Sequence, residues 1–196
     1  TASAELHAIN KENGILEWSI DIGGSSDMIQ IDEDKIFVTS SLYEIEVQDY
    51  TETTFFTFDK NGKLLKKIKF EEKPWFMEKE NHNIILGIGR PRCGILTIDK
   101  EYDISHSRTD GNSPVNMGIK TNVGFLLGHS DGSLTEINEI DRKSIQCGND
   151  SITAMNSVDF SWQVGDENGN IFSSEGWTNK LGNRINCIVE LSLIHI

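Results

Sequence analysis

Hydrophobic and polar residues alternate along most of the chain with the period of two that is typical of β-strands. The alternating runs are short, clusters of Gly, Asn and Asp separate them, and none of the longer stretches keeps the period of a helix. The clearest pair of runs, Phe55–Lys60 and Lys63–Phe70, flanks Asn61-Gly62. Asn-Gly between two such runs predicts a β-hairpin with a type I′ turn, because both residues accept a positive φ. The pattern therefore predicts an all-β protein built from hairpins.

An alternating run that ends in an acid or an amide recurs along the chain. Its copies end at positions 10, 59, 99, 138 and 175, so that the spacings are 49, 40, 39 and 37 residues. Three of these spacings lie close to the roughly 40–45 residues of a β-propeller blade, and the longer first one contains an insertion, Ser40–Thr54. Two strands precede each of the last four copies, and Gly87, Gly128 or Gly165 closes the second strand in three of them. Each repeat is thus expected to hold four strands, with Gly where the backbone turns or packs closely.

Sheets of this kind bury their faces only against neighbouring sheets, so the repeats predict a β-propeller, with a β-sandwich as the alternative. The expected units are a half-blade at 1–24, full blades at about 25–72, 73–112, 113–149 and 150–184, and the start of another at 185–190. The chain is therefore expected to be an incomplete propeller; closure of a five-bladed ring by the first half-blade is the alternative. Residues 191–196 match a peptide that a common sequencing adapter encodes, so this tail is expected to be non-native.

Three segments carry a family resemblance. Leu6–Trp18 resembles the closing strand pair of a PQQ-like (quinoprotein-type) β-propeller repeat, which typically reads aromatic or Leu, x, Ala-Leu-Asp, a short spacer, Thr-Gly and then Trp. Gly128–Leu134 and Gly165–Ile171 resemble the Gly-x-x-Asp-Gly-x-Leu/Ile link that PQQ-like and WD-type propellers share. The resemblance spans nearly the whole chain. It implies the propeller architecture and says little about activity.

The same resemblance raises one enzymatic possibility, a quinone- and calcium-dependent alcohol dehydrogenase. Such enzymes bind the quinone against a disulfide between adjacent cysteines, whereas Cys93, Cys147 and Cys187 are far apart in the sequence. No acidic calcium ligands can be placed by motif, and the five histidines never stand at metal-ligand spacing. We therefore assign no catalytic, cofactor-binding or metal-binding residue, and we expect no cofactor and no enzymatic activity.

Composition agrees with an all-β fold and limits the function. The chain has 25 Ile and only 4 Ala, which favours strands over helices. The net charge of −13 argues against binding to nucleic acid or anionic lipid, since both require clustered Lys and Arg. No apolar run reaches the length of a membrane span. Three scattered cysteines weakly favour the cytoplasm, while Thr1 in place of an initiator Met leaves a preceding signal peptide open.

The remaining candidate is a surface for a protein or peptide partner. In a propeller, the links between second and third strands lie on one face with the links that join blades. Tyr, Trp and Arg on that face are the residue types most able to anchor an interface. The candidate partner-binding residues are Tyr43, Tyr50, Trp75, Arg90, Arg92 and His129. Replacing both Arg90 and Arg92 with Glu is expected to weaken partner binding several-fold and to leave thermal stability nearly unchanged.

The charges on this face allow two kinds of partner. Arg90 and Arg92 flank a proline on an acidic protein and can pair with an acidic partner. The insertion carries four acids that can attract cations, namely Glu44, Glu46, Asp49 and Glu52. We therefore expect a non-catalytic β-propeller scaffold or interaction module that binds a protein or peptide through its loop face. The alternatives are a propeller enzyme or ligand-binding protein whose site lies partly in missing blades, and an envelope assembly propeller.

Overall fold

A computed structural model describes residues 4–109, 113–138 and 141–189, and every regular element in these residues is a β-strand. The strands are β1 (Glu5–Ile9), β2 (Leu16–Asp21), β3 (Ser25–Asp32), β4 (Lys35–Glu44), β5 (Asp49–Asp59), β6 (Leu64–Phe70), β7 (Pro74–Glu80), β8 (Asn83–Ile88), β9 (Gly94–Ile98), β10 (Ile104–Ser107), β11 (Val115–Thr121), β12 (Gly124–His129), β13 (Ser133–Asn138), β14 (Arg142–Gln146), β15 (Ile152–Val158), β16 (Ser161–Asp166), β17 (Asn170–Ser173) and β18 (Thr178–Lys180). The prediction of an all-β protein is confirmed. No helix in the described part of the chain is long and apolar enough to cross a membrane.

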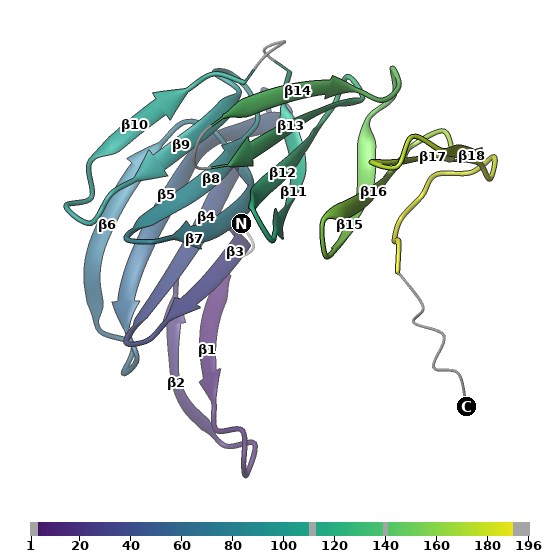
Figure 1. Cartoon of the computed structure of the whole chain (residues 1–196). Helices are drawn as coiled ribbons and strands as arrows, with labels where there is room; N and C mark the ends of the chain where they lie inside the picture. The colour runs from purple at the N-terminus through teal and green to yellow at the C-terminus, as the bar shows by residue number, and fades with distance from the viewer. Residues whose placement is uncertain (1–3, 110–112, 139–140, 190–196) are drawn as a thin grey trace, which may run out of the picture.

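The strands form five antiparallel sheets in which neighbours in the sequence are neighbours in space. β1 and β2 form a two-stranded sheet, and the four-stranded sheets are β3–β6, β7–β10, β11–β14 and β15–β18. The first strands of successive four-stranded sheets, β3, β7, β11 and β15, lie next to one another. Figure 1 shows the sheets following one another along an arc, from the β1–β2 hairpin to β17 and β18. The expected non-native tail, 191–196, lies outside the described residues.

The recurring acid or amide of the sequence repeats closes the turn into the last strand in four of the five sheets. Its side-chain oxygen accepts backbone N–H groups two to four residues further on, which stabilises the turn. Asp59 Oδ1 accepts from the next-but-one residue, Asn61, and from Lys63, both at 2.9 Å. Asn10, Asp99 and Asn138 do the same in their turns, and in the β17–β18 turn Ser173 takes this role instead of Glu175. Tight turn closure explains why the motif recurs.

The turn at Asn61-Gly62 differs from the predicted type I′. Gly62 has φ +81°, but Asn61 is not among the residues with positive φ. The carbonyl of Asp59 accepts the N–H of Gly62 at 3.0 Å, and the Asp59 N–H donates to the carbonyl of Lys63 at 2.9 Å. The Asp59 side chain therefore stabilises a longer turn that needs a single left-handed residue, and Gly62 supplies it.

The insertion Ser40–Thr54 forms a continuation of two strands and not a separate loop. β3 pairs with β4 only as far as Ser41, and β6 pairs with β5 only from Thr53. Between these limits β4 and β5 pair with each other alone, and Tyr43 lies opposite Tyr50. Residues 42–52 thus form a two-stranded extension of the sheet, called the arm below.

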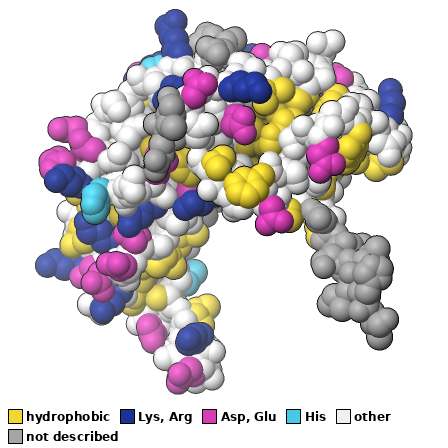
Figure 2. Space-filling view, viewed as in Figure 1, with side chains coloured by type: hydrophobic (Ala, Val, Ile, Leu, Met, Phe, Trp, Pro, Cys, Tyr) yellow, Lys and Arg dark blue, Asp and Glu magenta, His cyan; other side chains and the backbone are white. Residues whose placement is uncertain are grey.

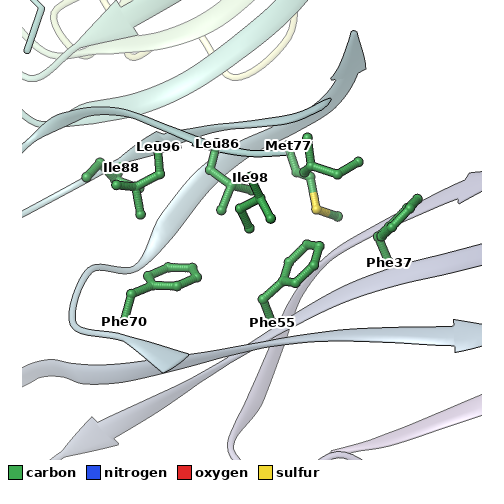
Figure 3. Close-up of a cluster of buried hydrophobic side chains, with 9 residues drawn as sticks. Phe37, Phe55, Phe70, Met77, Leu86, Ile88, Leu96 and Ile98 are labelled. Atoms are coloured by element: carbon green, nitrogen blue, oxygen red, sulfur yellow. The ribbon is translucent and has the colours of Figure 1, made fainter. Parts of the chain in front are cut away.

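Hydrophobic clusters fill the space between each sheet and the next, and the largest lies between β3–β6 and β7–β10. Figure 3 shows Phe37, Phe55 and Phe70 of the first of these sheets facing Leu86 and its aliphatic neighbours on the second. The side chains of adjacent residues along one strand lie on opposite faces of the sheet. Leu86 of β8 packs toward β3–β6, while Ile85 packs toward β11–β14. Both faces of an inner sheet are therefore buried, as stacked repeats require.

The three strand-closing glycines lie at these interfaces. A Cβ on Gly87 would come within 2.8 Å of Val115, one on Gly128 within 2.7 Å of Ile152, and one on Gly165 within 2.5 Å of Ile185. Val115 and Ile152 are the first residues of the following sheets. Gly at these positions is needed because a β-branched side chain of the next unit packs directly on the backbone.

Candidate partner-binding surface

An aromatic row links the arm to the second four-stranded sheet. The rings of Tyr43 and Tyr50 meet edge to face with centroids 5.2 Å apart, and Tyr50 meets Trp75 in the same way at 6.4 Å. Trp75 stands at the start of β7, where its indole packs against Gly89. Tyr43 is 48% exposed and Trp75 42% exposed. Three of the predicted partner-binding residues thus form one partly exposed aromatic surface.

Lys73 lies beneath this row and fixes it. Its Nζ is 3.6 Å from the ring centroid of Tyr50 and 4.7 Å from that of Trp75, within the range of cation–π attraction. The same Nζ is 2.7 Å from the Asp27 carboxylate, and these two side chains are only 11% and 3% exposed. Asp27 also accepts a hydrogen bond from Ser41 at the root of the arm. The sequence reasoning missed Lys73 and Asp27, because only the packing of two sheets brings them together.

A hollow of about 500 Å³ lies beside the aromatic row. Its lining comes from the arm and from two links, and consists of Asp49, Tyr50, Arg90, Pro91, Cys93 and Pro114. Arg90 and Pro91, in the link from β8 to β9, are exposed. Among the described residues Arg90 makes no ion pair. The structure thus places Arg90 at the same hollow as Asp49 and Tyr50 of the arm.

Arg92 lies in the same link but has a different environment. Its Nε and Nη2 donate to the two carboxylate oxygens of Glu72, the second at 2.7 Å. The Glu72 side chain is fully buried, while that of Arg92 is 45% exposed. The hydrogen bond to Glu72 raises the pKa of Arg92. Arg92 therefore anchors its link to the segment that joins β6 to β7, and we revise the expectation that its replacement leaves stability unchanged.

His129 does not belong to the exposed surface, because its side chain is fully buried. Nδ1 lies 3.1 Å from the carbonyl of Ser113 and Nε2 lies 2.8 Å from the hydroxyl of Thr135. A carbonyl only accepts, so Nδ1 carries the proton and Nε2 accepts from Thr135 in the neutral ring. Burial lowers the pKa of His129. This residue connects the link before β11 to β13 and leaves no part of its side chain for direct contact with a partner.

Within residues 4–109, 113–138 and 141–189, no three His, Cys, Asp or Glu side chains are placed to hold a metal ion. Burial raises the pKa of the Cys147 thiol to about 11 and also raises that of Cys93, whereas Cys187 is exposed.

In the view of Figure 2, charged side chains crowd the part that holds β1–β10, and hydrophobic side chains show toward β15–β18.

These features define a class of protein in which repeated four-stranded antiparallel sheets stack side by side. No protein-family model matches the sequence, and a search of curated proteins finds no match. Among solved structures, the computationally designed Ika8 protein is similar, with a TM-score of 0.70 and 12% identity over 96% of this chain. KlHsv2 with loop 6CD replaced by a Gly-Ser linker is also similar, with a TM-score of 0.57 and 11% identity over 86% of this chain. The chain spans 60% and 56% of the lengths of these two proteins, and at such identities the likeness concerns the fold alone.

Proposed function

We propose that the chain is an incomplete β-propeller of about four full blades with partial blades on either side. The likeness to Hsv2, a β-propeller protein, supports this proposal, as do the side-by-side sheets with hydrophobic clusters between them. Ile185 packs on Gly165 as Val115 packs on Gly87, which supports a further blade that begins at Ile185. The PQQ-like resemblance of the first repeat remains part of the proposal.

The proposed function is that of a non-catalytic interaction module that binds a protein or peptide. One observation carries it: the row of Tyr43, Tyr50 and Trp75 is partly exposed, contacts the buried Lys73 and lies beside a hollow of about 500 Å³. Rigid aromatic side chains contribute strongly to binding because they bury a large area and lose little conformational entropy. The buried Lys73–Asp27 pair contacts Tyr50 and Trp75 from the inner side of the row.

Partner capture with a matched pair of tryptophan variants tests this function. Trp75→Ala removes the end of the aromatic row, and Trp177→Ala removes a tryptophan of similar exposure, 44%, next to β18. Tagged wild-type protein and both variants are used to enrich partners, which are quantified by mass spectrometry after equal folding is verified by circular dichroism. We expect Trp75→Ala to lose the partners that the wild type and Trp177→Ala retain. Equal recovery by all three proteins would show that the aromatic row is not the binding surface.

A further inference from the structure

The charges and rings of this surface also indicate the chemistry of the partner, an inference that rests on the proposed function. We propose that the surface binds an extended peptide segment rich in Lys or Arg. The partner's cationic side chains stack on the exposed parts of Tyr43 and Trp75 and pair with the carboxylates of the arm. An acidic segment held by Arg90 is the competing occupant.

The aromatic row already binds one ammonium group within the protein. Lys73 Nζ lies 3.6 Å from the centroid of Tyr50 and 4.7 Å from that of Trp75. The attraction arises from the negative faces of the rings, and it grows when the cation is partly removed from water. Lys73 occupies the inner side of the row, whereas Tyr43 and Trp75 keep 48% and 42% of their surface exposed. The exposed ring surface offers the same chemistry to a cation of a partner.

The unpaired charge around the row is mainly negative. Of the four acids of the arm, Glu52 pairs with Lys69 at 2.6 Å. Glu44, Glu46 and Asp49 are exposed, and none of them forms an ion pair within the described residues. The cations nearby are largely engaged, since Lys73 pairs with Asp27 and Arg92 with Glu72. Within the described residues 73–109, which include the second four-stranded sheet and its links, Arg90 and Arg108 are the exposed cations that make no ion pair.

Charge complementarity therefore favours a cationic partner. Three free carboxylates lie on one short arm, and the chain as a whole has a net charge of −13, which steers cations toward it. The arm also exposes apolar side chains, with Ile45 82% and Val47 58% exposed. Lys and Arg carry apolar stems that pack on such side chains while the charged ends reach carboxylates. Asp49 and Tyr50 both line the hollow, so a cationic side chain that enters it meets a carboxylate and a ring together.

Fluorescence anisotropy with two labelled probes tests this inference at physiological salt. The first probe is a Gly/Ser peptide with Lys at alternate positions, and the second is the same peptide with Glu in place of Lys. The arm variant Glu44→Gln, Glu46→Gln, Asp49→Asn removes the free carboxylates of the arm. Its control, Glu12→Gln, Glu33→Gln, Asp103→Asn, removes the same net charge from exposed positions elsewhere. Trp75→Ala and Trp177→Ala form the second matched pair.

We expect the Lys probe to bind the wild type more tightly than the Glu probe. The arm variant and Trp75→Ala should each weaken binding of the Lys probe about tenfold or more, while both controls stay within about twofold. Tighter binding of the Glu probe, equal effects of the two triple variants, or no binding of either probe would overturn the inference. The capture experiment with the tryptophan variants tests the proposed function separately. If partners are lost only with Trp75→Ala, the surface is an interaction surface, even when the probes show that its partner is not cationic.

Discussion

The pair between Arg92 and Glu72 predicts a stability difference between two neighbouring arginines. Replacing Arg92 with Met removes two hydrogen bonds and leaves the fully buried Glu72 carboxylate without its cation. Replacing Arg90 with Met removes an exposed cation that makes no ion pair in the described chain. The two substitutions are chemically identical and lie two positions apart. The environment of each side chain alone decides the outcome.

The magnitude follows from the burial of each partner. Removing one member of a fully buried ion pair costs about 3–5 kcal/mol, because an uncompensated charge stays in the interior. Arg92 is 45% exposed, so water can reach part of the vacated site and reduce this cost. We therefore expect Arg92→Met to lower the free energy of unfolding by about 2 kcal/mol. Arg90→Met should change it by less than about 0.5 kcal/mol.

Urea unfolding followed by tryptophan fluorescence measures these differences. A double-mutant cycle with Glu72→Gln isolates the interaction, because Gln keeps the shape of the side chain without its charge. Once Glu72 is Gln, replacing Arg92 with Met should cost less than about 1 kcal/mol. Equal effects of Arg90→Met and Arg92→Met, or a cost of Arg92→Met that is independent of Glu72, would refute the role of the buried pair.

Three further predictions concern the core, pH and the thiols. Gly128→Ala should destabilise by about 1–3 kcal/mol in urea unfolding because its Cβ would overlap Ile152, whereas Ser144→Ala on exposed β14 should have little effect; equal effects would contradict the close packing. Burial lowers the pKa of His129, so its imidazole binds a proton more readily in the unfolded chain than in the folded one. The free energy of unfolding should therefore fall as the pH drops through about 6.5, and it should fall less in His129→Gln. Identical pH profiles of the two proteins would exclude this contribution. At pH 8 or so, iodoacetamide should alkylate exposed Cys187 well before Cys147, whose pKa burial raises to about 11, and peptide mass mapping that found the reverse order would contradict the burial of Cys147.

Much of the architecture could be predicted from local patterns. In four of the five sheets, the acid or amide before the last strand caps a turn through its own side chain, and this local function explains why it recurs in the sequence. Gly87, Gly128 and Gly165 are visible for a related reason, since no larger residue fits where the next sheet packs on the backbone. The type of turn at Asn61-Gly62 could not be predicted, because the Asp59 side chain competes with the preference of Asn-Gly.

The candidate surface was only partly predictable. Tyr, Trp and Arg in the expected links are typical of interfaces, so four partner-binding residues could be proposed that the structure does bring together: Tyr43, Tyr50, Trp75 and Arg90. Whether a given polar residue is free or engaged depends on residues far away in the sequence. Glu72 reaches Arg92 across 20 positions, and no local spacing rule indicates this contact.

By itself, then, the sequence determined that this protein is a series of four-stranded antiparallel sheets, because strand alternation and turn capping act over a few residues. Only the tertiary structure decided which charges remain available. In the folded protein His129 is buried, Arg92 pairs with Glu72, and the Lys73 ammonium contacts the rings of Tyr50 and Trp75. The physical reason is that burial and ion pairing depend on how neighbouring sheets pack, and this packing joins residues from different repeats.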